Sequence, residues 1–336
     1  MRKLAALLKG KRRLLIIIQD FPDPDAMASA AALHALARKL AGVQSTITYS
    51  EAVGRSENQA MIKHLGIRLR PFDQIDPSTF DAVAMVDAQP GTGNTSTPPS
   101  IRPDILIDHH LRRHPAARSA FTDIRTQYGA TSTILFEYLH EAHIQPDMAL
   151  STALFYGIWS DTQDIGRKCG PADLDALLRL YQSASSGMLR EIRRGKVPRT
   201  YFQNLAEALS HARTYGRAIV TGLGQVENPD MIAEVADLLL RNESSRWALC
   251  YGFRRRTALF SLRTSDPRGN AGRMAHRIAG DRGSGGGHVG SAGGQVLLIR
   301  DSSSERRQVA SLIVKRFLQF THASDEAAGR LIRLRG

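Results

Sequence analysis

Carboxylates and imidazoles stand immediately after several short apolar runs of this sequence. In chain order they are Asp23, Asp25, Asp87, Asp108, His109, His110 and Asp161. A single aspartate in such a place is commonly a helix cap or a turn residue. Four separate segments that each deliver acidic or imidazole groups are not explained by capping alone, so we expect these side chains to meet in one site.

Clustered carboxylates repel one another unless a cation neutralises them, so the physical reading of this set is a metal site. A set rich in oxygen ligands, with one or two histidines and no cysteine, suits Mn²⁺ or Mg²⁺, with Co²⁺ or Fe²⁺ as substitutes. Two ions about 3.5–4 Å apart can clamp a phosphoryl group and activate water for in-line attack. The residues therefore indicate metal-assisted phosphoester hydrolysis.

A parallel sheet would bring these side chains together, because ligands bind beyond the carboxyl ends of its strands. A short apolar run typical of a buried strand occurs at residues 14–18, and strand-like stretches recur at 45–49, 82–86 and 105–107. Helical spacing of apolar residues separates or follows them at 26–40, 57–65, 131–143 and 148–159. Residues 90–103 have the composition of a loop. This alternation predicts an α/β fold whose parallel sheet is covered by helices.

The second half of the chain has its own pattern. Strands are expected at residues 217–221, 247–253, 258–263 and 295–300, helices at 229–241 and from 304 onward, and a glycine-rich loop at 280–294. We therefore predict a catalytic domain over 1–185, a connector over 186–215, and a smaller α/β substrate-binding domain over 216–336. The active site is expected in the cleft between the two domains.

Charge separates the same two halves. The 336 residues carry a net charge of +13, of which residues 1–185 hold +1 and residues 186–336 hold +12. A basic surface attracts polyanions and speeds their association. The composition, with 42% hydrophobic and 23% charged residues, excludes wholesale disorder. Cys169 and Cys250 are the only cysteines, too few for a disulfide framework.

The best candidate for a membrane span, Leu14–Ile18, is far shorter than the roughly 20 residues that span a bilayer. A secretory leader would need a longer apolar stretch with a small-residue cleavage site. We therefore expect a soluble, cytoplasmic protein that has no membrane partner.

The motifs, taken in order, resemble those of the DHH phosphoesterase superfamily. They are Pro22-Asp23-Pro24-Asp25-Ala26, Val86-Asp87, Ile107-Asp108-His109-His110, Ser160-Asp161-Thr162, Ser261-Leu262-Arg263-Thr264 and Gly285-Gly286-Gly287-His288. The last two look like parts of the DHH-associated C-terminal domain. The two-domain layout is similar to NrnA-type oligoribonucleases with pAp phosphatase activity, and to stand-alone cyclic-di-AMP or pApA phosphodiesterases.

This resemblance implies a role for each matching position. It implies two Mn²⁺ ions, with Mg²⁺ or Co²⁺ as alternatives, bound by Asp23 at the first site, by Asp25, His109 and Asp161 at the second, and by Asp87 at both. His110 would face the scissile phosphate, and Asp108 would hold an imidazole in place.

One position departs from the family pattern. The family usually has a histidine four residues before the first aspartate, and here that residue is Gln19. An amide is a poorer ligand than imidazole for first-row divalent ions. The first metal would then be bound weakly, bound through Gln19 or Asp20, or lost.

The basic half is expected to capture the substrate, which would be short RNA or DNA or a dinucleotide. Arg263 is the candidate phosphate clamp, and Gly285, Gly286 and Gly287 would bring backbone N–H groups close to a phosphate. His288 would hydrogen-bond an anionic oxygen. Two alternatives stay open: a DHH-type inorganic pyrophosphatase, and a nucleotide sensor whose hydrolysis has decayed. The oligomeric state is also open, a homodimer being one alternative.

Overall fold

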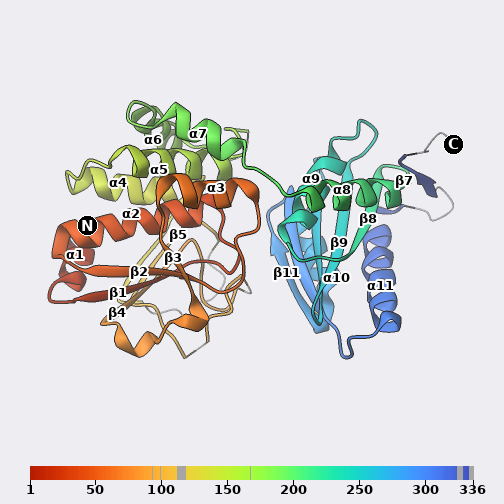
Figure 1. Ribbon diagram of the computed structural model, residues 1–336, viewed down its shortest axis with the longest axis horizontal. Coiled ribbons are helices and arrows are strands. Elements are labelled where there is room, and N and C mark those ends of the chain that lie inside the picture. The colour runs from red at the N-terminus through yellow and green to blue at the C-terminus, as the bar shows by residue number, and fades with distance from the viewer. Residues whose placement is uncertain (93, 99, 112–118, 167, 324–327, 333–336) are drawn as a thin grey trace. The chain divides into compact units, whose positions relative to one another are not determined.

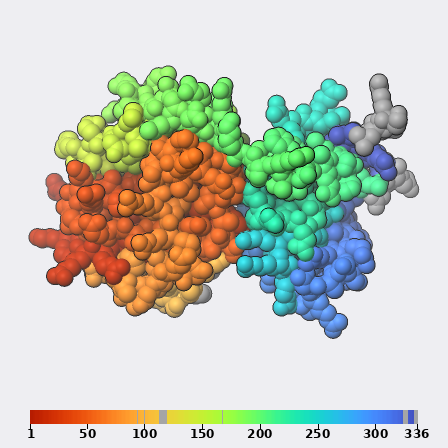
Figure 2. All heavy atoms as spheres, in the orientation of Figure 1, coloured from red at the N-terminus to blue at the C-terminus, as the bar shows by residue number. Residues whose placement is uncertain are grey.

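The computed structural model describes the chain apart from residues 93, 99, 112–118, 167, 324–327 and 333–336 (Figure 1). The chain divides into two compact units, Met1–Lys196 and Val197–Gly336, and Figure 2 shows one face of the surface of each. The division falls inside the predicted connector, which is not a bare linker because it contains two helices. Within the described residues, no helix is long and apolar enough to cross a bilayer.

The first unit is built on a sheet whose neighbouring strands are all parallel. In spatial order the strands are β3 (Leu69–Pro71), β2 (Gln44–Tyr49), β1 (Arg13–Ile17), β4 (Ala82–Val86), β5 (Ile105–Asp108) and β6 (Phe121–Ile124). The stretches predicted as strands correspond to β1, β2, β4 and β5. The edge strands β3 and β6 were not predicted, because each is short and largely accessible and so carries no continuous apolar run.

The helices of this unit gather on one face of the sheet, as Figure 1 shows for α2 to α6. They are α1 (Arg2–Leu8), α2 (Pro24–Ala41), α3 (Ser56–Leu65), α4 (Thr131–Glu141), α5 (Met148–Asp161), α6 (Pro171–Tyr181) and α7 (Ser186–Arg193). Strand β1 faces both ways: Leu14 and Ile16 join the helix-covered core, whereas Leu15 and Ile17 join a smaller cluster on the other face. Phe72 of the 3₁₀ turn η1 (Phe72–Gln74) packs against that cluster, and a second 3₁₀ turn, η2, spans Pro77–Thr79.

Strand order places the predicted site at one edge of this sheet. From β1 the chain winds outward through β2 and β3, then returns to the other side of β1 for β4, β5 and β6. The direction of winding therefore reverses between β1 and β4, and such a switch point is where open parallel sheets bind ligands. The segments that follow β1, β4 and β5 all leave from this edge.

The second unit is a mixed sheet with helices on both faces. In spatial order its strands are β11 (Gly283–Gly287), β12 (Ser291–Leu297), β10 (Thr257–Thr264), β9 (Trp247–Arg254), β8 (Ala218–Gln225), β7 (Arg213–Tyr215) and β13 (Ala328–Arg330). Among the described strands of this second sheet, only β8 and β9 pair in parallel. Alternate residues of β9 separate the two cores: Trp247 and Leu249 face one, and Ala248 and Cys250 face the other.

Two helices cover each face of this second sheet. Helices α10 (Ala271–Ala279) and α11 (Ser303–Thr321) pack on the Trp247 side. Helices α8 (Arg199–His211) and α9 (Asp230–Leu240) pack on the Cys250 side. The predicted helices at 229–241 and from 304 onward correspond to α9 and α11. The 3₁₀ turn η3 (Gly280–Arg282) follows α10.

The glycine-rich segment 280–294 is not the loop that its composition predicted. It forms the antiparallel pair β11 and β12, with Gly285 opposite Gly294. Glycine is unfavourable in strands, so the high glycine content led to the prediction of a loop. The tertiary reason for glycine here is close packing of α10 against β11: a Cβ on Gly285 would lie 2.4 Å from the carbonyl oxygen of Ala275.

Candidate metal centre

The start of α2 places two carboxylates after β1. Asp23 is the N-cap, and its Oδ1 accepts a hydrogen bond of 2.9 Å from the Ala26 N–H, while Pro24 occupies the first helical position. Both features are favourable local signals for a helix start. Asp25 is buried, and its two oxygens accept hydrogen bonds from the backbone N–H groups of Thr131 (2.7 Å) and Ser132 (2.8 Å). Asp25 therefore sits on the N-terminus of α4, where unpaired N–H groups and the helix dipole favour an anion.

Asp87 follows β4 in a left-handed backbone conformation, with φ of 56°. Aspartate tolerates this region better than most residues. The side chain is buried and accepts a hydrogen bond of 2.8 Å from the Thr131 hydroxyl. Thr131 thus contacts both Asp25 and Asp87, and it ties the ends of β1 and β4 to the start of α4.

Asp108, the last residue of β5, holds the following two residues in place. Its Oδ1 accepts hydrogen bonds from the backbone N–H of His109 (2.8 Å) and from Nδ1 of His110 (2.8 Å). Its Oδ2 accepts a hydrogen bond of 2.6 Å from the Gln89 amide. Both oxygens of Asp108 are therefore engaged in orienting His110 and its loop.

His109 points its two ring nitrogens at different partners. Nδ1 lies 3.2 Å from the carbonyl oxygen of Tyr128, and because a carbonyl only accepts, Nδ1 is the donor. Nε2 lies 3.1 Å from Oδ2 of Asp161, the last residue of α5, and 3.7 Å from Oδ1 of Asp87. In the neutral ring, the Nε2 lone pair therefore faces carboxylate oxygens from two other segments.

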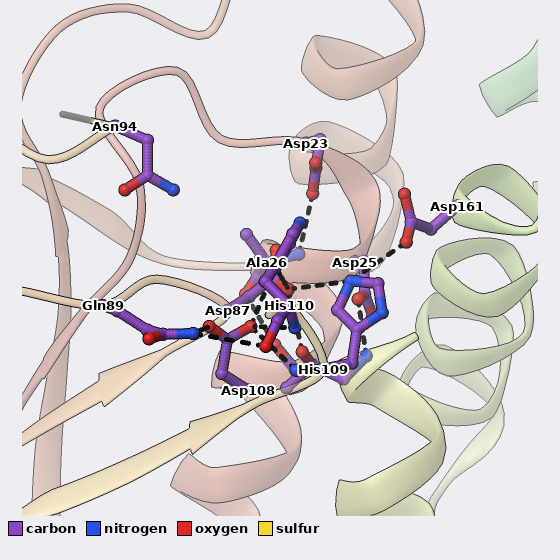
Figure 3. Close-up of polar contacts among 12 residues, drawn as sticks. Asp23, Asp25, Ala26, Asp87, Gln89, Asn94, Asp108, His109, His110 and Asp161 are labelled. Carbon is purple, nitrogen blue, oxygen red and sulfur yellow. Dashed lines mark hydrogen bonds and ion pairs between the residues drawn. The ribbon is translucent and has the colours of Figure 1, made fainter. Parts of the chain in front are cut away.

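Two overlapping groups of ligand atoms result, each with its atoms within 4.8 Å of one another (Figure 3). One contains Asp87, His109 and His110, and the other contains Asp25, His109 and Asp161. A lone pair that faces two carboxylates is repelled unless the ring takes up a second proton or a cation lies among them. The donor set thus fits a divalent cation, with carboxylate oxygens and imidazole as ligands.

Both groups share His109, although the sequence predicted Asp87 as the shared ligand. An imidazole nitrogen has one lone pair and binds one ion, whereas a carboxylate has two oxygens and can bind two. Asp87 Oδ1 lies 3.7 Å from His109 Nε2 and also 3.7 Å from His110 Nδ1. The role of Asp87 as a bridging ligand stays a prediction.

The electrostatics of the buried carboxylates agree with a site for a cation. Burial, and next the charge of Asp23, raise the pKa of Asp25 to about 6. Burial and the surrounding aspartates raise the pKa of Asp87 well above its usual range. Strong upward shifts at carboxylates in one cluster are typical of functional sites, because without a cation the cluster resists full ionisation.

In the Asp108–His110 pair, the pKa of the carboxyl is lowered and the pKa of the imidazole is raised. Burial alone would raise the pKa of Asp108, but the hydrogen bonds and charge of His110 outweigh it and hold this pKa below its usual range. Burial alone would lower the pKa of His110, but the hydrogen bond and charge of Asp108 outweigh it and raise this pKa. The pair therefore favours an imidazolium held by a carboxylate.

Most of the predicted site residues of the first unit meet at this edge, as Figure 3 shows for Asp23, Asp25, Asp87, Asp108, His109, His110 and Asp161. Asp23 differs from the rest, because one of its oxygens caps α2 and the residue belongs to neither group of ligand atoms. Gln19 follows β1 and is partly accessible. Whether Gln19 and Asp23 bind a metal stays a prediction. Asp20 is instead a loop anchor, which accepts hydrogen bonds from the N–H and hydroxyl of Ser96.

Sequence reasoning missed the residues that orient these ligands: Gln89, Tyr128, Thr131 and Ser132. Three of them lie in the segment 128–132, which supplies a carbonyl to His109, N–H groups to Asp25 and a hydroxyl to Asp87. The available signal was Thr131 and Ser132 directly after a glycine–alanine pair at the predicted helix start. Their hydrogen bonds to Asp25 connect residues 106 and 107 positions apart in the sequence, and no local sequence pattern predicts such long-range contacts.

In the second unit, Arg263 lies on β10 with its guanidinium engaged. Nε and Nη2 donate to the carboxylate of Asp237 on α9, and Nη1 donates to the Ser261 hydroxyl at 2.7 Å. A phosphate would have to displace Asp237 to be clamped by Arg263. Gly285, Gly286 and Gly287 lie on the edge strand β11. His288 follows them in the turn, where its backbone N–H donates to Ser291 and its carbonyl accepts from Gly272.

A family model and a curated relative match this chain. The model of the DHH family, N-terminal domain, matches residues 14–158. The uncharacterized protein MJ1633 of Methanocaldococcus jannaschii is 32% identical over 342 residues, covering 96% of this chain and 70% of that protein. The relative spans both units described above.

Two solved structures are similar to this chain to different degrees. An exopolyphosphatase-related protein from Bacteroides fragilis matches with a TM-score of 0.71 and 14% identity, covering 94% of this chain and 96% of its own. The magnesium complex of RecJ from Thermus thermophilus matches with a TM-score of 0.46 and 15% identity, covering 94% of this chain and 52% of its own. The first of these shows a shared fold over nearly the whole chain.

Proposed function

The chain belongs to the DHH family, whose members are metal-dependent phosphoesterases, and we propose that it hydrolyses phosphodiester bonds in short oligonucleotides or dinucleotides. The observation that supports this most directly is the position of His109 Nε2, 3.1 Å from Asp161 and 3.7 Å from Asp87. These residues come from β4, β5 and α5, and their donor atoms suit two hard divalent ions. We propose Mn²⁺ as the preferred ion, because imidazole ligands favour it over Mg²⁺.

The bound ions would clamp the phosphoryl group and lower the pKa of a water so that it attacks in line. The residues of the chain orient that reaction. Asp87, Asp25, His109 and Asp161 hold the ligand positions, and α4 fixes Asp25 through two backbone N–H groups. His110 is held at Nδ1 by Asp108, and 36% of its side chain is exposed, so its ring is accessible to a substrate. We propose that His110 hydrogen-bonds the phosphate and the leaving oxygen.

The net charge of +12 in residues 186–336 supports a polyanionic substrate in preference to pyrophosphate. Capture of that substrate by Arg263, the β11 glycines and His288 is part of the proposal. The position of Arg263 beside Asp237 adds a requirement: a bound phosphate competes with this carboxylate.

The test offers purified protein pApA, pAp, cyclic-di-AMP and pyrophosphate, each with Mn²⁺, Mg²⁺ or Co²⁺ or with EDTA. We expect metal-dependent turnover of at least one of the nucleotide substrates. Binding without turnover of any of them would favour the sensor alternative, and turnover of pyrophosphate alone would favour the pyrophosphatase alternative.

Asp87→Asn is the variant that ties activity to the site. Asparagine accepts the left-handed backbone at this position and can keep the hydrogen bond with Thr131, so the fold should be retained while a ligand charge is removed. We expect turnover to fall by about a thousandfold or more, on the order of the loss of one central electrostatic group. Asp164→Asn is the matched control, because Asp164 is exposed and also has a left-handed backbone. Turnover of Asp87→Asn within threefold of the Asp164→Asn control would contradict the assignment.

A further inference from the structure

A cavity in the second unit lies apart from every residue assigned above. Its volume is about 330 Å³, and its lining comes from α10 and α11: Arg277, Arg316, Gln319 and Phe320. Ligand pockets commonly begin at about 300 Å³, so the volume suits a small ligand. The pocket is open to solvent, because Arg277 and Gln319 are exposed and Arg316 and Phe320 are half-buried.

The fold holds Arg316 in place. Its Nη1 donates a hydrogen bond of 2.6 Å to the carbonyl oxygen of Ile278, in the last turn of α10. The neighbouring residue Gly280 has a φ of 57°, and a Cβ there would lie 2.8 Å from the same Nη1. Glycine is therefore needed both for the backbone conformation and for the approach of the guanidinium. An arginine fixed in this way loses little further side-chain freedom when it binds an anion.

The helical segments that line the cavity carry basic residues and no carboxylate, and Asp281 of η3 is the first acidic residue after α10. Helix α10 carries Arg273, His276 and Arg277 and no carboxylate, and residues 312–321 of α11 include Lys315 and Arg316 and again no carboxylate. Other arginines of this unit are neutralised by ion pairs. They include Arg263 with Asp237, Arg282 with Glu305, and Arg306 with Asp301.

The ring of Phe320 supplies an aromatic wall. It packs edge-to-face against the buried Trp247 of β9, with ring centroids 6.0 Å apart. Gln319, the preceding residue, has an amide that can both donate and accept hydrogen bonds. A planar base can stack on such a ring at a gain of about 1–3 kcal/mol, while the two guanidinium groups hold a phosphate.

We propose that this cavity is a nucleotide-binding site, in which Arg277 and Arg316 bind the phosphate and Phe320 stacks with the base. The nucleotide is either free or one unit of a nucleic-acid strand. The site is made by residues of the second unit alone and contains no metal ligand, so its existence does not depend on the proposed hydrolysis.

Trp247 provides a direct readout because it contacts Phe320. In a Trp159→Phe background, Trp247 is the sole tryptophan. The titration uses AMP, adenosine, inorganic phosphate and a five-nucleotide RNA in EDTA, with Trp247 fluorescence as the signal. We expect a saturable change with AMP, and weaker binding of adenosine and of phosphate than of AMP. Tighter binding of the RNA than of AMP would identify a strand as the source of the nucleotide, and equal or weaker binding would identify a free nucleotide.

Arg277→Ala and Phe320→Leu are each expected to weaken AMP binding by about tenfold or more, since a charge-assisted hydrogen bond or a stacked ring contributes on that order. Arg273→Ala, one turn earlier on α10 and also exposed, is the matched control and should leave the affinity unchanged.

The proposal is overturned if AMP gives no saturable signal, or if Arg277→Ala binds as tightly as Arg273→Ala. It is also overturned if His288→Ala abolishes the signal while Arg277→Ala keeps it, because the nucleotide would then sit beside β11. Circular dichroism of each variant shows whether the unit is still folded, and Arg277, being exposed, can be replaced without disturbing the core. Hydrolysis by the metal centre can fail in the assays described earlier without affecting any of these outcomes.

Discussion

Raising the pH from 5 to 8 in the absence of divalent metal is expected to destabilise the first unit. Burial, and next the charge of Asp23, raise the pKa of Asp25 from 3.8 to about 6, and burial and neighbouring carboxylates raise that of Asp87 in the same direction. A carboxyl with a raised folded-state pKa holds its proton more tightly in the folded than in the unfolded chain. The free energy of unfolding therefore falls as the pH rises from the unfolded pKa through the folded one.

The magnitude follows from Asp25 alone. Its rise from 3.8 to about 6 corresponds to about 3 kcal/mol, at about 1.4 kcal/mol per pKa unit. His110, whose pKa is raised above 6.5, adds a loss of the same sign as the pH rises through its folded value. Asp108 has a lowered pKa, so its contribution changes only below about pH 4. Only the part of this loss that occurs above pH 5, about one pKa unit or about 1.4 kcal/mol, falls between pH 5 and pH 8, and for a unit of this size it lowers Tm by about 3–6 °C.

The assay follows thermal unfolding by tryptophan fluorescence in a Trp247→Phe variant, in which Trp159 of α5 reports on the first unit alone. In EDTA the Tm should fall between pH 5 and pH 8. Saturating Mn²⁺ at pH 8 should restore it, because the ion binds the folded state and neutralises the carboxylates. Asp87→Asn should raise the metal-free Tm at pH 8 and weaken the response to Mn²⁺. A Tm in EDTA that stays level or rises over this interval would refute the reasoning.

Further predictions concern single residues. Gln19→His should tighten Mn²⁺ binding at the first site, as imidazole is the better ligand, and calorimetry that finds the same affinity and stoichiometry would show that residue 19 does not face a metal. Thr131→Val should weaken Mn²⁺ affinity by about 10- to 100-fold, as loss of a group that orients a ligand commonly does, whereas Thr131→Ser should retain the affinity. Equal Mn²⁺ affinities of Thr131→Val and Thr131→Ser would contradict this role. Arg263→Ala should raise KM for a short RNA by about 10- to 100-fold. The affinity of the wild-type protein for this RNA should fall as the salt concentration rises. Asp237→Asn should lower that KM by freeing the guanidinium, and an unchanged KM in both variants would leave Arg263 with a structural role only.

Local patterns predicted the interior of the first unit well and its periphery poorly. Strands β1, β4 and β5 coincide with apolar runs, because a strand buried on both faces needs apolar residues at nearly every position. The edge strands β3 and β6 carry no such run. The pair β11 and β12 was missed for a different reason. Its glycines allow α10 to pack closely against β11, and strand propensity does not encode this contact.

The chemistry of the site could be anticipated because it depends on residue type and on one topological rule. Aspartates and histidines after parallel strands must arrive at one sheet edge, so Asp87 and His109 were predicted to meet before any contact was known. Distances of 3.7 Å between their ligand atoms agree with that rule. Donor types alone also indicated hard divalent ions.

Only the tertiary structure decided how each ligand is oriented. The start of α4 reaches across more than 100 residues to Asp25, the Tyr128 carbonyl selects the ring nitrogen that His109 presents, and Asp237 occupies Arg263. Periodicity along a sequence encodes which residues are buried, and composition encodes which chemistry they carry. The partner of a given hydrogen bond depends on how helices pack across the sheet, and that is settled by contacts between segments far apart in the chain.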